Sequence, residues 1–414
     1  MYWLNYTGGF TKGKNRNLGN RHNRLFKFYC ILIAINLGTF AAKLYTKILS
    51  MVNPNDIYTV IMAGGIGSRF WPISRTQKPK QFLDILGTGT SLIRQTFLRV
   101  SKFCKPENVY VVTGAEYKDQ IHEHIPELRS EQVLLEPMRR NTAPCIALAN
   151  HIIQKRNPNA IMVVAPSDHL IIEEDKFIKT ISKAIEFTAQ KEALLTIGIK
   201  PSRPETGYGY IQTEKNEDKA IPNLFKVKTF TEKPNLELAR VFIESGEFYW
   251  NSGIFIWSLQ AINKAFQRHL PEVQSLFEGI YDQFGTPQES SAVSSVYSQC
   301  RNISIDYGIL EKSENVFVIC SEFGWSDLGT WGSLYQNSEK DEAGNATSGG
   351  NLMMYDVKNS IINVPSDKLV VLQGLEDYIV VESDNILLIC RRDQEQSIKT
   401  FQNNVLVEKG DKYI

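Results

Sequence analysis

Short apolar runs alternate with amphipathic stretches between residues 57 and 320 of the chain. Runs rich in β-branched residues predict strands at 57–62, 108–113, 132–135, 160–165, 194–199, 225–231, 253–257 and 316–320. Two stretches between them have helical periodicity. One spans 142–155, with Asn141 as its cap and Pro144 in its first turn, and the other spans 176–190 behind Asp175. Strands that alternate with helices predict an α/β domain with a mostly parallel sheet.

The sequence pattern changes near residue 337. Residues 337–351 are polar and glycine-rich, which predicts a linker. Between 355 and 390, short strand-like pieces are separated by Asn, Asp and Gly without a helical pattern, so a small all-β domain is expected. The predicted organisation is an extension at 1–50, a main domain at 51–336, the linker at 337–351 and a small β domain at 352–414.

Composition limits the kinds of molecule that this protein is expected to bind. The chain is 43% hydrophobic and 22% charged, which is typical of a soluble globular protein. Of 46 Lys and Arg residues, eight lie in residues 1–50, where no Asp or Glu occurs. The rest of the chain therefore contains 38 basic and 45 acidic residues. A mildly acidic body argues against nucleic acid as the main partner. Six cysteines without CxxC spacing indicate reduced thiols of a cytoplasmic protein, and six scattered histidines predict no zinc site.

A glycine-rich loop follows the first predicted strand. Residues 62–72 read MAGGIGSRFWP, and residues 78–82 read KPKQF. Gly64, Gly65 and Gly67 allow the backbone of the loop, with Ser68, to approach phosphate groups closely. Arg69 and Lys80 would add positive charge. The loop matches neither a P-loop nor the dinucleotide fingerprint.

The combined segment resembles the signature of the sugar-nucleotide pyrophosphorylases, and GGIGSRFWPISR…KPKQF is most similar to the mannose-1-phosphate guanylyltransferase branch. The resemblance covers roughly residues 56–392. It implies a Rossmann-like nucleotidyltransferase catalytic domain at 51–336 and a short left-handed β-helix in the small β domain. No cupin-like segment follows that domain, so the form that also carries phosphomannose isomerase activity is not expected.

Two aspartates are candidate metal ligands. Asp168 follows the predicted strand 160–165, and Asp327 lies in the segment FGWSDLG. An Asp just past a buried strand often binds Mg²⁺, although it can equally serve as a cap or turn residue. By resemblance, both match the metal-binding aspartates of the family, which implies Mg²⁺ as cofactor. His169 is interpreted as a structural or supporting residue.

The sugar side is predicted from three further segments. Gly207, Tyr208 and Gly209 form a glycine-flanked turn whose backbone can approach a hexose. An EKP triplet in isolation reads as a solvated turn. By resemblance, its Glu232 bonds sugar hydroxyls, its Lys233 meets the sugar phosphate, and Asn251 supplies an amide for hydroxyl groups.

Base recognition is assigned to residues 136–144, EPMRRNTAP, which resemble a nucleotide-lining element of the family. Guanine presents N1–H and the N2 amino group as adjacent donors, and an ionised carboxylate can accept both. We therefore expect Glu136 to bind guanine, with Asn141 and Thr142 nearby. The alternative is that Glu136 only ends its strand.

The resemblance implies that GTP and α-D-mannose 1-phosphate react to give GDP-mannose and diphosphate, with Arg69 and Lys80 as catalytic residues. One alternative is another sugar-1-phosphate nucleotidyltransferase, using dTTP or UTP with glucose 1-phosphate. Another is a non-catalytic homologue that binds sugar nucleotides and regulates a partner. A homodimer is possible, because the β appendage contributes to dimer contacts in such families.

The extension at 1–50 contains an apolar run at 28–42. This run could belong to a signal peptide or a membrane anchor, but it is shorter than the ~20 residues of a spanning helix. We favour a translation start at Met51, because an enzyme that uses nucleoside triphosphates needs the cytosol. Membrane attachment is therefore not expected.

Overall fold

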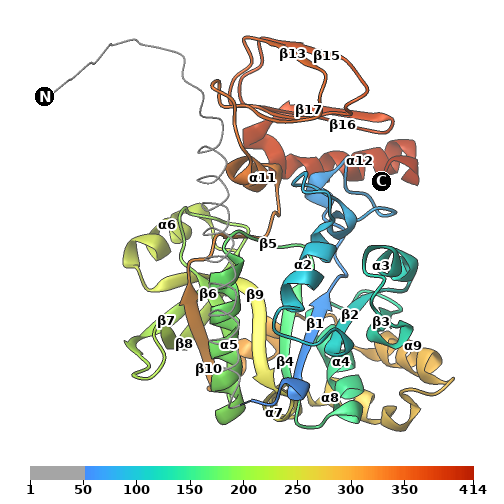
Figure 1. Cartoon of the computed structure of the whole chain (residues 1–414), viewed down its shortest axis with the longest axis vertical. Coiled ribbons are helices and arrows are strands. Elements are labelled where there is room, and N and C mark those ends of the chain that lie inside the picture. The colour runs from blue at the N-terminus through green and yellow to red at the C-terminus, as the bar shows by residue number, and fades with distance from the viewer. Residues whose placement is uncertain (1–51) are drawn as a thin grey trace, which may run out of the picture. The chain divides into compact units, whose positions relative to one another are not determined.

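The computed structural model describes residues 52–414. Its centre is a sheet of nine strands in the order β3-β2-β1-β4-β9-β6-β10-β8-β7 (Figure 1). The strands are β1 (Ile57–Met62), β2 (Val109–Gly114), β3 (Val133–Glu136), β4 (Ile161–Pro166), β6 (Leu194–Ile199), β7 (Gly209–Glu217), β8 (Leu224–Glu232), β9 (Phe248–Ser258) and β10 (Val316–Ser321).

All strands of this sheet except β8 and β9 run in one direction, as the pairings require. The eight predicted strands are present, with ends that differ by a residue or two in most cases. The exception is β9, which begins at Phe248 and lies antiparallel between β4 and β6. Its first half contains Asn251 and Ser252, and these polar residues interrupt the hydrophobic pattern in that half of the strand.

Helices pack on both faces of the sheet (Figure 1). They are α2 (Leu92–Val100), α3 (Lys118–His124), α4 (Thr142–Arg156), α5 (Glu174–Gln190), α6 (Leu236–Ser245), α7 (Leu259–His269), α8 (Pro271–Glu278), α9 (Glu289–Gln299), α10 (Ile305–Gly308), α11 (Trp331–Asn337) and α12 (Ile398–Lys409). Asn141 caps α4 as predicted. The predicted cap Asp175 instead lies in the first turn of α5, where a carboxylate is favourable near the positive end of the helix dipole.

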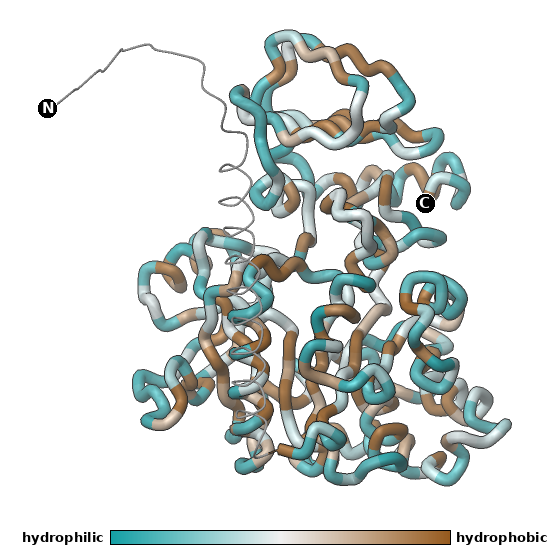
Figure 2. Tube along the Cα trace, in the orientation of Figure 1, coloured by the Kyte–Doolittle hydropathy of each residue, from teal (hydrophilic) through white to brown (hydrophobic). Residues whose placement is uncertain are grey.

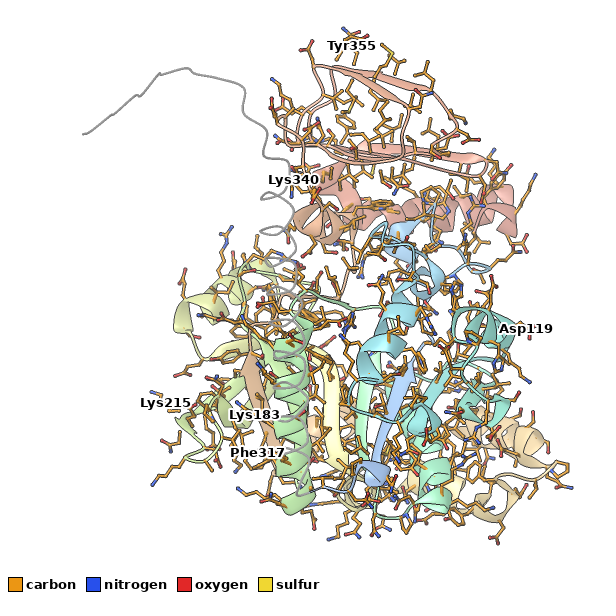
Figure 3. All side chains as sticks on the ribbon, viewed as in Figure 1. Asp119, Lys183, Lys215, Phe317, Lys340 and Tyr355 are labelled. Carbon is orange, nitrogen blue, oxygen red and sulfur yellow. The ribbon has the colours of Figure 1, made fainter. Side chains whose placement is uncertain are left out.

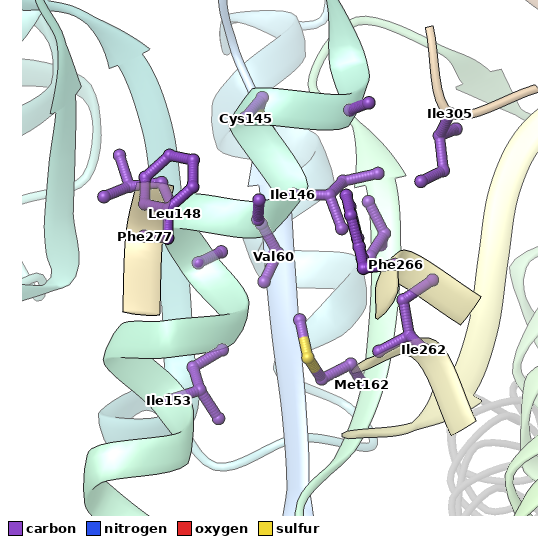
Figure 4. Close-up of a cluster of buried hydrophobic side chains, with 14 of the residues drawn as sticks. Val60, Cys145, Ile146, Leu148, Ile153, Met162, Ile262, Phe266, Phe277 and Ile305 are labelled. Atoms are coloured by element: carbon purple, nitrogen blue, oxygen red, sulfur yellow. The ribbon is translucent and has the colours of Figure 1, made fainter. Parts of the chain in front are cut away.

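The main core lies between the sheet and α4, α7 and α8. Figure 4 shows Val60 of β1, Ile146 and Ile153 of α4, Met162 of β4 and Phe266 of α7 meeting there. Figure 2 shows that the most hydrophobic segments follow the strands of the sheet. Burial of each such side chain contributes about 1.5–3 kcal/mol.

The C-terminal part of the chain is a coil of short parallel strands. β12 (Ala346–Ser348), β14 (Ile361–Asn363) and β16 (Tyr378–Ser383) form one ladder, to which β17 (Ile386–Arg391) adds antiparallel. β13 (Leu352–Tyr355) and β15 (Val370–Gln373) form the other. β12 falls inside the segment that the sequence predicted as a linker.

One correction concerns the end of this domain, which the sequence analysis assigned to β structure up to residue 414. Residues 392–397 form a 3-10 turn, and α12 follows. Ile398 and Gln402 of α12 are buried one helical turn apart, so a single face of the helix packs inward, and the helix contacts the Ser68–Phe70 turn as well as the C-terminal domain. The weak amphipathic pattern of this segment gave no clear helical signal.

Among residues 52–414, no helix combines the length and the apolar character that a membrane crossing requires. The apolar run at 28–42 and the proposed start at Met51 lie outside the described residues.

Candidate active site

The glycine loop leaves β1 at Met62 and turns sharply at Gly67, where φ is 73°. A Cβ at Gly67 would lie 2.5 Å from the Cβ of Lys80, so only glycine fits this turn. Within the described residues, the N–H groups of Gly64, Gly65 and Gly67 donate no hydrogen bond, and they are therefore available to a phosphate. Arg69 follows on a 3-10 turn at Ser68–Phe70.

Lys80 contacts two protein segments that are distant from it in the sequence. Its ammonium group donates to the carboxylate of Asp168 at 2.8 Å, to the backbone oxygen of Asp327 at 2.7 Å and to that of Leu328 at 3.0 Å. Its side chain is only 5% exposed. The three N–H donors of Lys80 are thus directed at two protein segments, and not at the loop where phosphates would bind.

Asp168 and Asp327 are brought together by a small antiparallel pair of strands. β5 (Leu170–Ile171) follows Asp168, β11 (Trp325–Ser326) precedes Asp327, and the two strands pair. Burial raises the pKa of Asp168, but the ammonium of Lys80, the neighbouring His169 and hydrogen bonds together lower it more, so that pKa lies below its usual value. His169 accepts a hydrogen bond at Nδ1 from the indole of Trp325 at 3.2 Å, which fits a structural role.

Tyr208 connects the sugar side to the second aspartate. Its hydroxyl donates to Oδ1 of Asp327 at 2.6 Å, and its ring contacts Trp250 and Trp325 edge to face. Burial and the neighbouring carboxylate of Asp327 raise the pKa of Tyr208 well above its usual value, so the hydroxyl remains a donor.

The other sugar-side residues lie along β7, β8 and β9. Gly209 begins β7, and Gly207 and Tyr208 lie in the bend that precedes this strand. A Cβ at Gly209 would lie 2.6 Å from the carboxylate of Glu232 on the paired strand. Lys233 forms an ion pair with Glu232. Gly207 lies just before β7, with its N–H bonded to Glu205.

Asn251 is fixed by a buried carboxyl group that the sequence analysis did not assign to the site. Its Nδ2 donates to Oδ1 of Asp306 at 2.7 Å, and its Oδ1 accepts from the N–H of Gly253 at 3.2 Å. Burial raises the pKa of Asp306 to about 6, although the hydrogen bond from Asn251 opposes the shift. Asp306 therefore sets the orientation of the Asn251 amide.

Glu136 lies beneath the glycine loop. Its carboxyl is 7% exposed, accepts a hydrogen bond from the hydroxyl of Tyr297 at 3.1 Å, and reaches within 3.4 Å of where a Cβ of Gly64 would be. Burial raises the pKa of Glu136 to about 7 despite the hydrogen bond from Tyr297. The carboxyl is thus near the loop, and its charge depends on pH in the neutral range.

The side chains of Asn141 and Thr142 form hydrogen bonds with backbone N–H groups of the protein. The side chain of Asn141 accepts from the N–H of Thr142 at 2.9 Å, and the hydroxyl of Thr142 accepts from the N–H of Ile305 at 2.8 Å. The second bond ties the start of α4 to the helix that carries Asp306.

The two aspartates fit a divalent metal ion that prefers oxygen ligands. Such ions are often bound by one or two carboxylates together with water and substrate phosphates, not by a closed protein cage. The part of the chain that the structure describes contains no group of three His, Cys, Asp or Glu side chains that could hold a metal. Lys80 contacts the carboxylate of Asp168 and the backbone oxygen of Asp327, which places the two residues near each other, and their carboxylates would be oxygen ligands of that open kind.

Comparisons with known proteins first identify the class of protein. A nucleotidyl transferase family model matches residues 58–344, and a β-helix domain model of the mannose-phosphate isomerase and GMP type matches residues 350–404. The mannose-1-phosphate guanylyltransferase of Escherichia coli is 34% identical over 351 residues, or 83% of this chain and 75% of that protein. That of Salmonella montevideo is 34% identical over 371 residues, or 86% of this chain and 76% of that protein.

A solved structure agrees. The crystal structure described as mannose-1-phosphate geranyltransferase from Thermus thermophilus superposes with a TM-score of 0.75 at 27% identity, covering 84% of this chain and 99% of that one. The chain therefore belongs to the mannose-1-phosphate guanylyltransferase family of nucleotidyl transferases. Nucleotidyl transferases of this family generally use a divalent metal ion.

Sequence reasoning did not place two supports of the site. Asp306 lies in the segment SIDY, which resembles a family segment, but the resemblance indicated only a structural segment and not the contact with Asn251. Tyr297 lies on α9 within a Ser-rich stretch, and its local pattern carries no indication that it reaches Glu136, which is distant in the sequence.

We predict that replacement of Asp306 by Asn increases stability in a pH-dependent way. The raised pKa of Asp306 destabilises the folded protein as pH rises from about 4 through about 6, because the buried carboxyl must then ionise. Asn keeps the acceptor for Asn251 and removes this cost. In urea unfolding, the difference in free energy of unfolding between the variant and wild type should be about 2–3 kcal/mol more favourable to the variant at pH 7.5 than at pH 4.

The exposed Asp282→Asn serves as control and should show no such change with pH. A difference between Asp306→Asn and wild type that is constant across this pH range would contradict the assignment of a raised pKa.

Proposed function

We propose that this protein converts GTP and α-D-mannose 1-phosphate to GDP-mannose and diphosphate. The observation that carries the proposal is the convergence of Asp168 and Asp327 on Lys80, beside a glycine loop whose N–H groups are free among the described residues. The relatives named mannose-1-phosphate guanylyltransferase support the choice of substrates.

The reaction needs no protein nucleophile. A phosphate oxygen of mannose 1-phosphate attacks the α-phosphorus of GTP, an O–P bond forms, and the bond to the β-phosphate breaks so that diphosphate leaves. The N–H groups of Gly65 and Gly67 and the guanidinium of Arg69 would bind the triphosphate. Catalysis then consists of positioning and electrostatic stabilisation.

Lys80 would act in this reaction chiefly through the residues it holds. Its ammonium keeps Asp168 and the backbone at Asp327 in place, and it also contributes positive charge close to the reacting phosphates. Glu232 and the amide of Asn251 would bind sugar hydroxyls, and Lys233, with its side chain 58% exposed, would meet the sugar phosphate.

We propose Mg²⁺ as the metal ion, held by Asp168 and Asp327. Bound Mg²⁺ would neutralise negative charge on the phosphate oxygens that the reaction brings together. Tyr208 supports this assignment, because its hydrogen bond orients the carboxylate of Asp327.

The direct test is diphosphate release by the full chain with Mg²⁺ across a panel of nucleoside triphosphates and sugar 1-phosphates. We expect release with GTP and mannose 1-phosphate, and a fall in kcat of at least about 100-fold in Asp327→Asn, which keeps the hydrogen-bond acceptor but loses the charge. Asp282→Asn is the matched control. Release with another substrate pair would correct the substrates, and wild-type turnover in Asp327→Asn would contradict the role of Asp327.

We further propose that Glu136 recognises guanine. Its carboxyl lies next to Gly64, and in its ionised form it can accept hydrogen bonds from both N1–H and the N2 amino group. Because the pKa of Glu136 is about 7 in the protein without substrate, recognition should strengthen as pH rises above 7 and weaken below it.

The test compares GTP with ITP, which lacks the N2 amino group but carries the same triphosphate. In wild type, the ratio of kcat/KM for GTP over ITP should rise from pH 6 to pH 8. In Glu136→Gln the ratio should fall and lose its pH dependence, whereas Glu131→Gln, at an exposed position, should behave as wild type. An unchanged ratio in Glu136→Gln would exclude this role.

We also propose that the chain forms a homodimer through the outer face of β13 and β15. Met353, Tyr355, Leu369 and Val371 on and beside these strands are 46–56% exposed, and Met353 pairs in register with Val371. Figure 3 labels Tyr355 at the outer end of this domain. Apolar rows of this kind usually mark interaction surfaces, and a second copy can present the same row in return.

Light scattering should give the mass of a dimer for wild type and of a monomer for Val371→Lys. Val407→Lys on α12, where the side chain is 84% exposed, is the control and should remain dimeric. A monomeric wild type, or a dimeric Val371→Lys, would rule out this interface.

A further inference from the structure

The segment that carries Arg69 is held by residues from the far end of the chain. Directly after Arg69 and Phe70, the indole N–H of Trp71 donates to the backbone oxygen of Tyr413 at 2.7 Å. The ring of Trp71 is 5% exposed and lies in a hydrophobic cluster with Ile379 and Ile398 of the C-terminal domain. The glycine loop therefore rests on residues more than 300 positions later in the sequence.

Arg75 makes a second connection from the same segment. Its Nη2 donates to the backbone oxygen of Ser383 at 2.8 Å and lies 3.3 Å from the carboxylate of Asp384, in the turn between β16 and β17. Its Nε donates to the backbone oxygen of Pro72 at 3.0 Å. The side chain of Arg75 is only 14% exposed. It links the glycine-loop segment to the end of β16 and the turn that follows it.

Glu395 makes a third connection from the other direction. Its carboxylate accepts from the N–H of Gly332 at 2.6 Å, and the neighbouring Trp331 packs against Phe70 with ring centroids 5.1 Å apart. Arg69 lies within electrostatic range of Glu395. The C-terminal domain thus contacts Trp71, two residues after Arg69, and also Gly332, whose neighbour Trp331 packs against Phe70.

We propose that the C-terminal domain positions the glycine loop for the nucleotide, and that Trp71 and Arg75 are positioning residues for GTP binding. This inference rests on the proposed function of the loop. A loop with three glycines has many alternative conformations, and fixing it before GTP arrives lowers the entropy lost on binding. Mannose 1-phosphate would bind at other elements, β7 to β9, and these hydrogen bonds of Trp71 and Arg75 do not reach those strands.

The test is a separation of the two substrates in steady-state kinetics of the full chain. Trp71→Phe removes the N–H that reaches Tyr413 and keeps an aromatic ring. We expect KM for GTP and the Kd of GTP to rise about 3- to 10-fold, the range for one lost hydrogen bond, while KM for mannose 1-phosphate stays unchanged. Arg75→Met should act in the same direction through a different contact.

Trp257→Phe is the matched control. Trp257 is fully buried in the main core, and within residues 52–414 its indole N–H has no hydrogen-bond partner, so this variant loses side-chain volume only. It should lower the unfolding temperature without a change in either KM. If Trp71→Phe does not fold, Arg75→Met decides the question alone.

A Trp71→Phe or Arg75→Met enzyme with wild-type KM and Kd for GTP would overturn the inference, as would an equal rise for both substrates. The proposed function fails independently if wild type releases no diphosphate. In that case the Kd of GTP, measured by calorimetry on wild type and variants, still tests whether the C-terminal domain positions the loop.

Discussion

The ammonium group of Lys80 joins two segments that are distant from it and from each other in the sequence. It binds the carboxylate of Asp168 after β4 and the backbone oxygens of Asp327 and Leu328 after β11. A buried ammonium is stable only when its donors are satisfied, and here all three are. The same interaction keeps Asp168 ionised and determines how far apart the two aspartates lie. The glycine loop depends on it as well, because Gly67 packs directly on the side chain of Lys80.

Around this ion pair, the site is built from contacts between strands rather than from any single motif. The β5–β11 pair delivers both aspartates, and Tyr208 connects Asp327 to the sugar-side strands. Asp306 reaches the same region from α10 and orients Asn251. A reaction that joins two anions needs fixed positive charge and fixed ligands in place before the substrates bind, because reorganisation would otherwise add to the barrier.

The sequence predicted the parts of the site that depend on local pattern. The strand before the glycine loop, the glycines themselves and the position of Asp168 after a strand all follow from short segments. Asp327 was a candidate only by resemblance, because the two-residue strand β11 before it was not predicted. It predicted only the second half of β9, because the polar residues that the first half presents to the site break its hydrophobic pattern. Nor could it indicate that Lys80 faces the aspartates or that Tyr297 meets Glu136, since these contacts join residues far apart along the chain. Contacts of this kind follow from the order and register of the strands, and these cannot be derived from the local pattern of one sequence.

Glu136 and Asp306 are site residues that lower the stability of the folded protein. Glu136 is buried and Asp306 is half-buried, each carboxyl has a single side-chain donor, and burial raises the pKa of Glu136 to about 7 and that of Asp306 to about 6. A hydrophobic residue at either place would remove the cost of ionisation, so neither carboxyl is explained by stability. Each lies beside a residue of the proposed substrate site, Gly64 in one case and Asn251 in the other. The simplest physical account is that the free protein bears these unfavourable groups because they bind or orient the polar groups of the substrates.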